Sequence, residues 1–150
     1  MSENEMEICP DYYGGITDMV RNGLGYGTEW PEGNCLSFGF FLNKKLLGAL
    51  VFHDLRRHKE VWWTIYTVDK RWCNRKVLRL MFTIAFGRMD CRRISILVGK
   101  SNFQSLNLVR RLGFKEEGLL RQCSDDGEDC YVLGMLRSEC PWINFNGDKK

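Results

Sequence analysis

Long hydrophobic runs are missing from this sequence. No apolar stretch approaches the ~18–20 residues that a membrane-spanning helix requires. The first residues, Met1 to Glu5, are polar and acidic and lack the apolar segment of a secretory signal. We therefore expect a cytoplasmic protein that has no membrane partner.

Histidine and proline are scarce, and the cysteines are scattered. The two histidines, His53 and His58, lie far from any cysteine cluster, and none of the seven cysteines forms a C-x-x-C pair. A metal site is therefore not expected, and the odd number of cysteines favours reduced thiols over a disulfide framework. There is no internal repeat and no proline-rich linker, so residues 1–150 are expected to form one domain.

Neither sign of charge is in large excess. Lysine and arginine number 22 against 19 acidic residues, which gives a net charge of +3. This mild positive charge is compatible with an anionic ligand but falls short of the basic footprint of a dedicated nucleic-acid binder. The content of 44% hydrophobic and 27% charged residues is typical of a globular domain.

The apolar pattern predicts alternating strands and helices. Apolar residues recur at two-residue spacing in the predicted strands and at three- and four-residue spacing in the predicted helices. The predicted order is a strand near Ile8, a helix over 14–22, strands over 37–42, 45–52 and 60–68, a helix over 75–89, a strand over 93–98, a helix over 102–112, and strands over 118–123 and 130–136. This order predicts an α/β fold with one mixed sheet of about six to seven strands and helices on both faces.

Several details follow from the same pattern. Asn43 and Lys44 are expected to form a hairpin turn, and residues 54–59 a polar loop. The strand over 60–68 is apolar on both faces, so it is expected to be central and covered on both sides. Residues 23–33 contain four glycines and are expected to form a flexible loop beside the substrate, whereas residues 143–150 form a tail.

Residues 102–121 carry a motif that resembles a known family. The segment NFQSLNLVRRLGFKEEGLLR is similar to the block N-x-x-S/A-x-x-L-x-x-x-L-G-F, followed by E-G-x-x-R, of the GNAT acetyltransferases. The matching residues are Asn102, Ser105, Leu108, Leu112, Gly113, Phe114, Glu117, Gly118 and Arg121. The resemblance extends less sharply over residues 36–142, and is greatest to the branch that acetylates protein N-termini or ribosomal proteins and to small bacteriophage GNAT proteins.

The resemblance implies an acetyl-CoA-dependent N-acetyltransferase. Such an enzyme moves the acetyl group to a primary amine, on a protein N-terminus, a lysine or a small molecule, by direct attack in a ternary complex. In the family, a Q/R-x-x-G-x-G/A loop after the central strand holds the pyrophosphate of coenzyme A on backbone amides. Here that loop is Arg71-Trp72-Cys73-Asn74-Arg75-Lys76, in which Asn74 and Lys76 replace glycines while Arg75 and Lys76 add positive charge.

The implied cofactor-binding residues lie in two segments of the chain. The resemblance implies that the amide of Val68 polarises the thioester carbonyl. The full set of candidate cofactor-binding residues is Val68, Arg71, Asn74, Arg75, Lys76, Val77, Asn102 and Ser105.

Glu60 is the first candidate for the catalytic base. It precedes Arg71 by eleven residues, as does the glutamate base of the histone-acetyltransferase branch, and Trp62 beside it provides apolar surroundings that raise a carboxylate pKa. The alternative is that Glu60 begins a strand in solvent. The other candidate bases are His53, Asp54 and His58. The position at which many relatives place an acidic tyrosine holds Val109, so Tyr131, Ser101 or water is left as the acid.

The acceptor is expected to enter between the loop over 23–33 and the last hairpin. The side chains there form an acidic and aromatic rim suited to a cationic amine or a peptide N-terminus; they are Tyr26, Glu29, Trp30, Glu32, Asp125, Asp126, Glu128 and Asp129. The protein is expected to be a monomer or a homodimer. Two alternatives stay open: a catalytically inactive binding module of the same fold, and an enzyme that acetylates aminoacyl-tRNA through arginine pairs at 56–57, 92–93 and 110–111.

Overall fold

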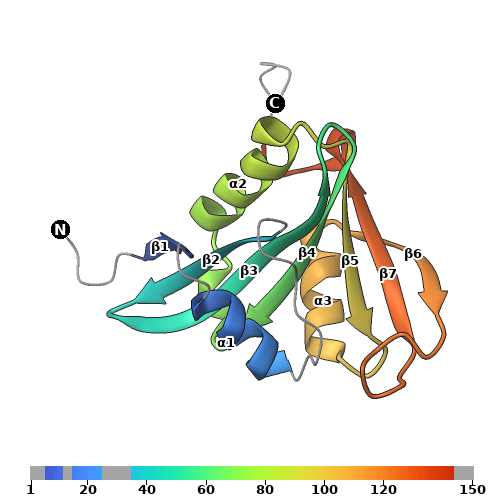
Figure 1. Ribbon diagram of the computed structural model, residues 1–150. Coiled ribbons are helices and arrows are strands. Elements are labelled where there is room, and N and C mark those ends of the chain that lie inside the picture. Colours follow the sequence, from blue (N-terminus) through green and yellow to red (C-terminus); the bar gives the residue numbers. More distant parts are fainter. Residues whose placement is uncertain (1–5, 12–14, 25–34, 144–150) are drawn as a thin grey trace.

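A seven-stranded mixed sheet forms the framework of the protein (Figure 1). The computed structural model describes residues 6–11, 15–24 and 35–143. The strands are β1 (Glu7–Pro10), β2 (Cys35–Leu42), β3 (Lys45–Arg56), β4 (Glu60–Thr67), β5 (Arg93–Gly99), β6 (Lys115–Leu120) and β7 (Cys130–Leu136). Their order in the sheet is β1-β2-β3-β4-β5-β7-β6. Among the described strands, only β4 and β5 pair in parallel, and their ladder lies at the centre of the sheet.

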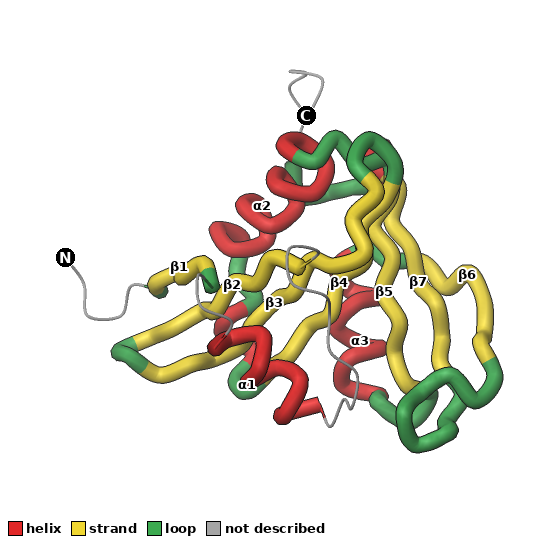
Figure 2. Tube along the Cα trace, in the orientation of Figure 1, coloured by secondary structure: helices red, strands yellow, loops and turns green. Residues whose placement is uncertain are grey.

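Helices lie on both faces of this sheet (Figure 2). The helical elements are α1 (Gly15–Leu24), the 3₁₀ turn η1 (Lys70–Trp72), α2 (Arg75–Thr83), the π-helical turn η2 (Ile84–Arg88), α3 (Phe103–Leu112) and the 3₁₀ turn η3 (Arg137–Glu139). Val20 of α1 packs against Ala49 and Val51 on one face. α2 and α3 bury Met81 and Val109 in the main core on the other face. The predicted order of elements is therefore confirmed.

The hairpin between β2 and β3 has the predicted turn. Asn43 and Lys44 have φ angles of 51° and 66°, and Leu42 pairs with Lys45 across them. Two consecutive left-handed residues characterise a type I′ turn, whose twist matches that of the flanking strands. Asparagine tolerates this backbone better than most residues, which explains its position at the first turn residue.

Aromatic side chains dominate the core beneath α2 and α3. Trp63 lies with its ring centroid 4.7 Å from that of Phe82 and 5.5 Å from that of Phe52. Phe40 and Trp72 stack with centroids 5.2 Å apart. Large buried rings contribute most of the apolar area removed from water, so this cluster fixes how α2 sits on the sheet.

Two predicted strand boundaries were wrong, and one predicted helix changes its geometry along its length. β3 continues to Arg56 because a bulge places two residues, Asp54 and Leu55, opposite Val61, so the predicted loop at 54–59 is shorter. The helix predicted over 75–89 changes at Ile84 from α to π geometry. The strand predicted over 118–123 runs instead from Lys115 to Leu120, since the backbone becomes left-handed at Gln122 (φ 53°).

β4 is central, as predicted, but among the described residues its covering is complete on one face only. Val61 and Trp63 are buried under α2 and α3, whereas Trp62, Thr64 and Tyr66 on the other face are only half-buried. The predicted loop over 23–33 begins within α1, which continues to Leu24; residues 25–33 of that loop and residues 144–150 of the tail lie outside the described residues. No helix in the described ranges has the length and apolar character needed to cross a membrane.

Candidate functional site

The two central strands separate part of the way along the sheet. The parallel ladder of β4 and β5 runs from the pair Glu60–Arg93 to the pair Trp63–Ile96. β4 nevertheless continues to Thr67 and β5 to Gly99. Because alternate residues of a strand turn their backbone groups to the same neighbour, every second residue beyond Trp63 directs N–H and C=O groups into the gap. The two central strands therefore separate beyond the pair Trp63–Ile96.

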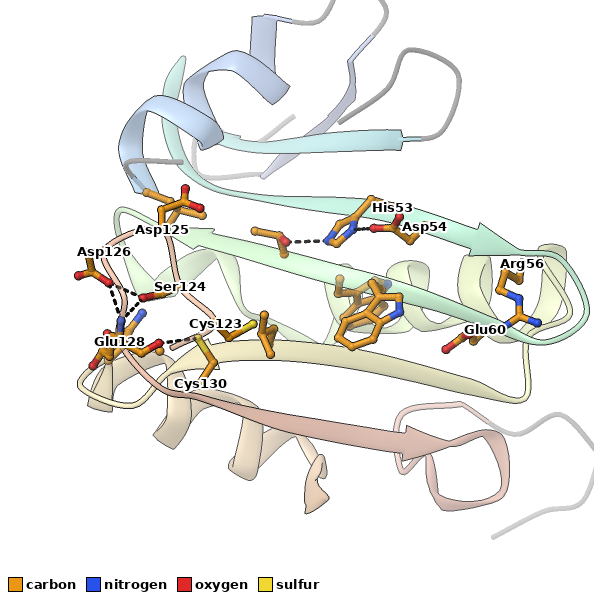
Figure 3. Close-up of a pocket in the computed structure, with 17 residues that line it drawn as sticks. His53, Asp54, Arg56, Glu60, Cys123, Ser124, Asp125, Asp126, Glu128 and Cys130 are labelled. Atoms are coloured by element: carbon orange, nitrogen blue, oxygen red, sulfur yellow. Dashed lines mark hydrogen bonds and ion pairs between the residues drawn. The ribbon is translucent and has the colours of Figure 1, made fainter. Parts of the chain in front are cut away.

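A cavity of about 920 Å³ opens at this separation. Its floor is the half-buried face of β3 and β4, and the connection between β6 and β7 forms one wall (Figure 3). The lining residues are Leu24, His53, Asp54, Arg56, Glu60, Trp62, Trp63, Thr64, Leu97, Gly99, Asn102, Cys123, Ser124, Asp125, Asp126, Glu128 and Cys130. A volume of this size accommodates a small molecule or a short segment of a larger one.

His53 lines the cavity, and both of its ring nitrogens are within hydrogen-bond distance of a neighbouring side chain. Its Nδ1 is 2.6 Å from Oδ2 of Asp54, and its Nε2 is 2.8 Å from Oγ1 of Thr64. An ionised carboxylate only accepts hydrogen bonds, so Nδ1 carries the proton and Nε2 presents its lone pair to the threonine hydroxyl. Burial lowers the pKa of His53, and hydrogen bonding to Asp54 opposes this only in part. The ring is therefore a neutral base at pH 7.

The bulge in β3 makes this arrangement possible. In a regular strand, neighbouring side chains point to opposite faces, so Asp54 would point away from His53. Asp54 has a left-handed backbone (φ 51°), which turns its carboxylate back to the imidazole. Thr64 reaches the ring from β4, because Val51 pairs with Thr64 and His53 with Trp62 on the same face of the sheet.

The cavity is strongly acidic. Its carboxylates belong to Asp54, Glu60, Asp125, Asp126 and Glu128, whereas Arg56 is its single lysine or arginine among the described residues. Arg56 is bound to Glu60 at 3.0 Å. The hydroxyl of Ser124 and the N–H of Glu128 donate to Asp126 and lower its pKa, so this exposed carboxylate stays charged. A wall with this charge attracts cations and repels phosphates.

The two predicted catalytic residues are not brought together. Glu60 lines the cavity at the start of β4, the end farthest from the strand separation, and it is paired with Arg56. Cys130 lines the cavity, so the next residue of β7, Tyr131, points to the opposite face, where it packs against the main core. Tyr131 therefore does not line the cavity, and its role as the acid, beside the alternatives Ser101 and water, stays a prediction.

The amide of Val68 has another role than the one predicted. Its N–H donates to the carbonyl oxygen of Leu47 at 2.8 Å, as does the N–H of Asp69. The predicted donation from Val68 to a thioester is wrong, because that N–H is already used within the sheet. The guanidinium of Arg71 is likewise engaged, with Nη2 2.8 Å from Oδ2 of Asp69.

Asn74, in the predicted phosphate-binding loop, caps the first turn of α2 with its side chain. It is the N-cap of α2 with an extended backbone (φ −115°), so no glycine is required there. Its Oδ1 accepts the N–H of Val77 at 3.0 Å, and this removes one amide from the set that would bind pyrophosphate. Arg75 and Lys76 lie exposed in the first turn of α2 and bring two positive charges to the same helix end.

The motif that carries the resemblance forms the ends of α3. Asn102 caps the helix with its Oδ1 3.2 Å from the N–H of Ser105, and it also lines the cavity. Gly113 ends the helix with a left-handed backbone (φ 113°). Asn102 therefore combines a capping role with a position beside the strand separation.

Three of the four rim residues predicted from the last hairpin line the cavity. Asp125, Asp126 and Glu128 line it, whereas Asp129 is not among the lining residues and accepts the N–H of Gln122 at 2.9 Å. The other half of the rim, formed by Tyr26, Glu29, Trp30 and Glu32, lies outside the described residues.

The sequence did not identify Thr64 as a candidate site residue. It also ranked His53 below Glu60 as a candidate for the catalytic base. The signal for His53 was its place at the end of an apolar strand directly before an aspartate. No sequence signal marks Thr64, because its contact with His53 depends on the register between β3 and β4.

Solved structures place this fold among known acetyltransferases. A variant of the spermidine N-acetyltransferase SpeG from Vibrio cholerae matches with a TM-score of 0.72 and 15% identity, covering 94% of this chain and 98% of that chain. The same enzyme in complex with manganese ions matches with a TM-score of 0.69 and 16% identity, covering 91% and 96%. No family model and no curated protein matches the sequence. The predicted GNAT fold is thus confirmed, and at this identity the likeness shows the fold alone.

Proposed function

We propose that the protein transfers the acetyl group of acetyl-CoA to a primary amine of a small cationic acceptor. The observation that carries the proposal is the position of His53, a neutral base in an acidic cavity that opens where β4 and β5 separate. The fold shared with spermidine N-acetyltransferases supports the same chemistry.

His53 would act as the general base in this reaction. The amine reaches Nε2 by taking the place of the Thr64 hydroxyl, and Asp54 stabilises the imidazolium that forms when the amine proton is transferred. Acetyl-CoA supplies the acetyl group as a thioester, whose thiolate departs readily. The cavity contributes by holding the two substrates in line, which replaces a bimolecular encounter by a positioned one.

Arg75 and Lys76 are assigned to the phosphates of coenzyme A. They stand at the N-terminus of α2, where the helix dipole adds to their charge, while Asn74 occupies the amide of Val77. Phosphate recognition would therefore depend on side chains more than on backbone amides. The gap between β4 and β5 suits the pantetheine arm, because its backbone groups have no ladder partner among the described strands.

Acetyl-CoA binding tests the cofactor assignment. We expect R75A/K76A to raise the Kd for acetyl-CoA about 10- to 100-fold in calorimetry, as the loss of two charge-assisted contacts implies. The matched control R88A/R92A removes two exposed charges near the other end of the helix and should leave the Kd within about twofold. A wild-type protein that does not bind acetyl-CoA would contradict the proposed function and leave the inactive binding module in its place.

The acidic wall predicts the acceptor class. We expect D125N/D126N to raise the KM for spermidine roughly 5- to 30-fold, because each lost charge removes about 1 kcal/mol or more of attraction. The KM for 1-aminohexane should change less, since that amine has one positive charge. D129N is the control, as Asp129 does not line the cavity. Steady-state kinetics at low and high salt would measure both effects, and faster turnover of neutral than of cationic amines would contradict the assignment.

The aminoacyl-tRNA alternative gains no support. Three of the arginines proposed to follow an RNA backbone are paired with glutamates: Arg56 with Glu60, Arg93 with Glu117, and Arg110 with Glu116. The acidic cavity would moreover repel a phosphate chain. A small cationic acceptor fits these charges better.

A further inference from the structure

The hydroxyl group of Thr64 lies against the basic nitrogen of His53. Oγ1 of Thr64 lies 2.8 Å from Nε2, while Oδ2 of Asp54 lies 2.6 Å from Nδ1 (Figure 3). We propose that Asp54, His53 and Thr64 form a nucleophilic triad, in which Thr64 accepts acyl groups from activated esters and thioesters and releases them to water. This activity is distinct from amine acetylation and does not require coenzyme A.

The order of the hydrogen bonds gives each residue its role. Asp54 accepts from Nδ1–H and fixes the tautomer, so Nε2 must accept the proton of the Thr64 hydroxyl. A hydroxyl next to a base, with the base oriented by a third group, is the arrangement that activates a weak oxygen nucleophile. The same triad logic appears on unrelated folds, so it is recognised from geometry and not from sequence position.

The location of Thr64 suits an acyl acceptor. It is the first residue of β4 beyond the last ladder pair, Trp63–Ile96, and its side chain lines the cavity. It is half-buried, so its hydroxyl is shielded from bulk water yet open to the cavity. Backbone N–H groups that the strand separation turns into the gap are available to a developing oxyanion.

The chemical step balances without an external reagent. The Thr64 oxygen attacks the acyl carbon and its proton passes to Nε2 of His53. The imidazolium then gives this proton to the departing alkoxide or thiolate of the donor as the acyl ester forms on Thr64, which returns His53 to its neutral form. Water then attacks this ester with His53 again accepting a proton, and the departing Thr64 oxygen takes a proton back. The products are the free carboxylic acid, the donor alcohol or thiol, and unmodified Thr64.

A second histidine–aspartate pair provides a matched control. His58 lies with Nδ1 2.8 Å from Oδ2 of Asp90, but both residues are exposed and lie outside the cavity. An acylation that depends only on a histidine beside a carboxylate would be lost in H58A as readily as in H53A. One that depends on the triad would be lost only in H53A.

The test uses 4-nitrophenyl acetate without coenzyme A. We expect a burst of about one equivalent of 4-nitrophenolate, an acetyl adduct mapped to Thr64 by peptide mass spectrometry, and slow steady hydrolysis. T64V, which keeps the shape of the side chain and suits a strand, should lose the burst and the Thr64 adduct, and so should H53A. T64S and H58A should keep both. Circular dichroism would verify that each variant is folded.

Two results would overturn the triad. One is a burst of equal size in wild type and T64V, which would place the acetyl group on other nucleophiles such as the cysteines. The other is wild-type protein with no adduct on Thr64 after prolonged incubation. Neither result depends on acetyl-CoA binding. Failure of the triad proposal can therefore be distinguished from failure of the proposed amine acetyltransferase activity.

Discussion

Replacement of His53 by alanine is expected to lower kcat/KM for amine acetylation by about 10²- to 10⁴-fold, the usual contribution of a positioned general base. His53 is the one group in the described part of the cavity that combines a lone pair at neutral pH with a carboxylate holding it in place. H58A should retain wild-type kinetics, because His58 lies outside the cavity. The measurement is the steady-state rate of acetyl transfer to spermidine.

The pH profile gives a second readout of the same residue. Burial lowers the pKa of His53 below its usual 6.5, because the charged ring is less well solvated than the neutral one. The base is therefore more than half neutral at pH 6.5, and the midpoint of the acid limb of the rate profile should lie below that pH. The acid limb should be absent from the residual activity of H53Q. If H53A and H53Q instead keep the wild-type rate and profile, Glu60 and Asp54 become the remaining candidate bases in the cavity.

Much of the fold follows from local sequence. The alternation in β7 gave its bounds, Cys130–Leu136, and the Asn43–Lys44 turn was identified from one favoured residue. α3 was predicted because Asn102 and Gly113 mark its two ends with opposite backbone requirements. These features depend on neighbours in the chain, so a single sequence contains the information for them.

The site depends on contacts that the chain makes over longer distances. The register between β3 and β4 brings His53 into contact with Thr64. Asp54 contacts His53 because of a bulge, and no residue type in the sequence predicts a bulge at this position. The face to which Tyr131 points could not be predicted, because one residue of register moves a side chain to the other face of the sheet. The hydrogen bond from the Val68 N–H to the Leu47 carbonyl oxygen could not be predicted either, because the sequence alone does not show which backbone groups are paired.

Removal of the Trp72 side chain is expected to have the largest effect on stability. The indole is fully buried, stacks on Phe40, and donates its Nε1–H to Oγ1 of Thr67 at 3.0 Å. Gly48 lies so close that a Cβ there would be 2.6 Å from the indole, so the surroundings have no room to rearrange around a different ring position. We expect W72A to lower the free energy of unfolding by about 3–5 kcal/mol, as for other buried aromatic truncations.

This tryptophan also connects the core to the proposed phosphate site. It ends η1, and Asn74, two residues later, caps α2, so a loosened Trp72 should displace the helix end that presents Arg75 and Lys76. W72F, which keeps an aromatic ring, should lose less stability than W72A and should weaken acetyl-CoA binding measurably while the protein remains folded. W62A provides the comparison: Trp62 is half-buried on the cavity face, so its truncation should cost less. Urea denaturation of the three variants measures their free energies of unfolding. A larger loss of unfolding free energy in W62A than in W72A would show that the core beneath α2 does not anchor the fold.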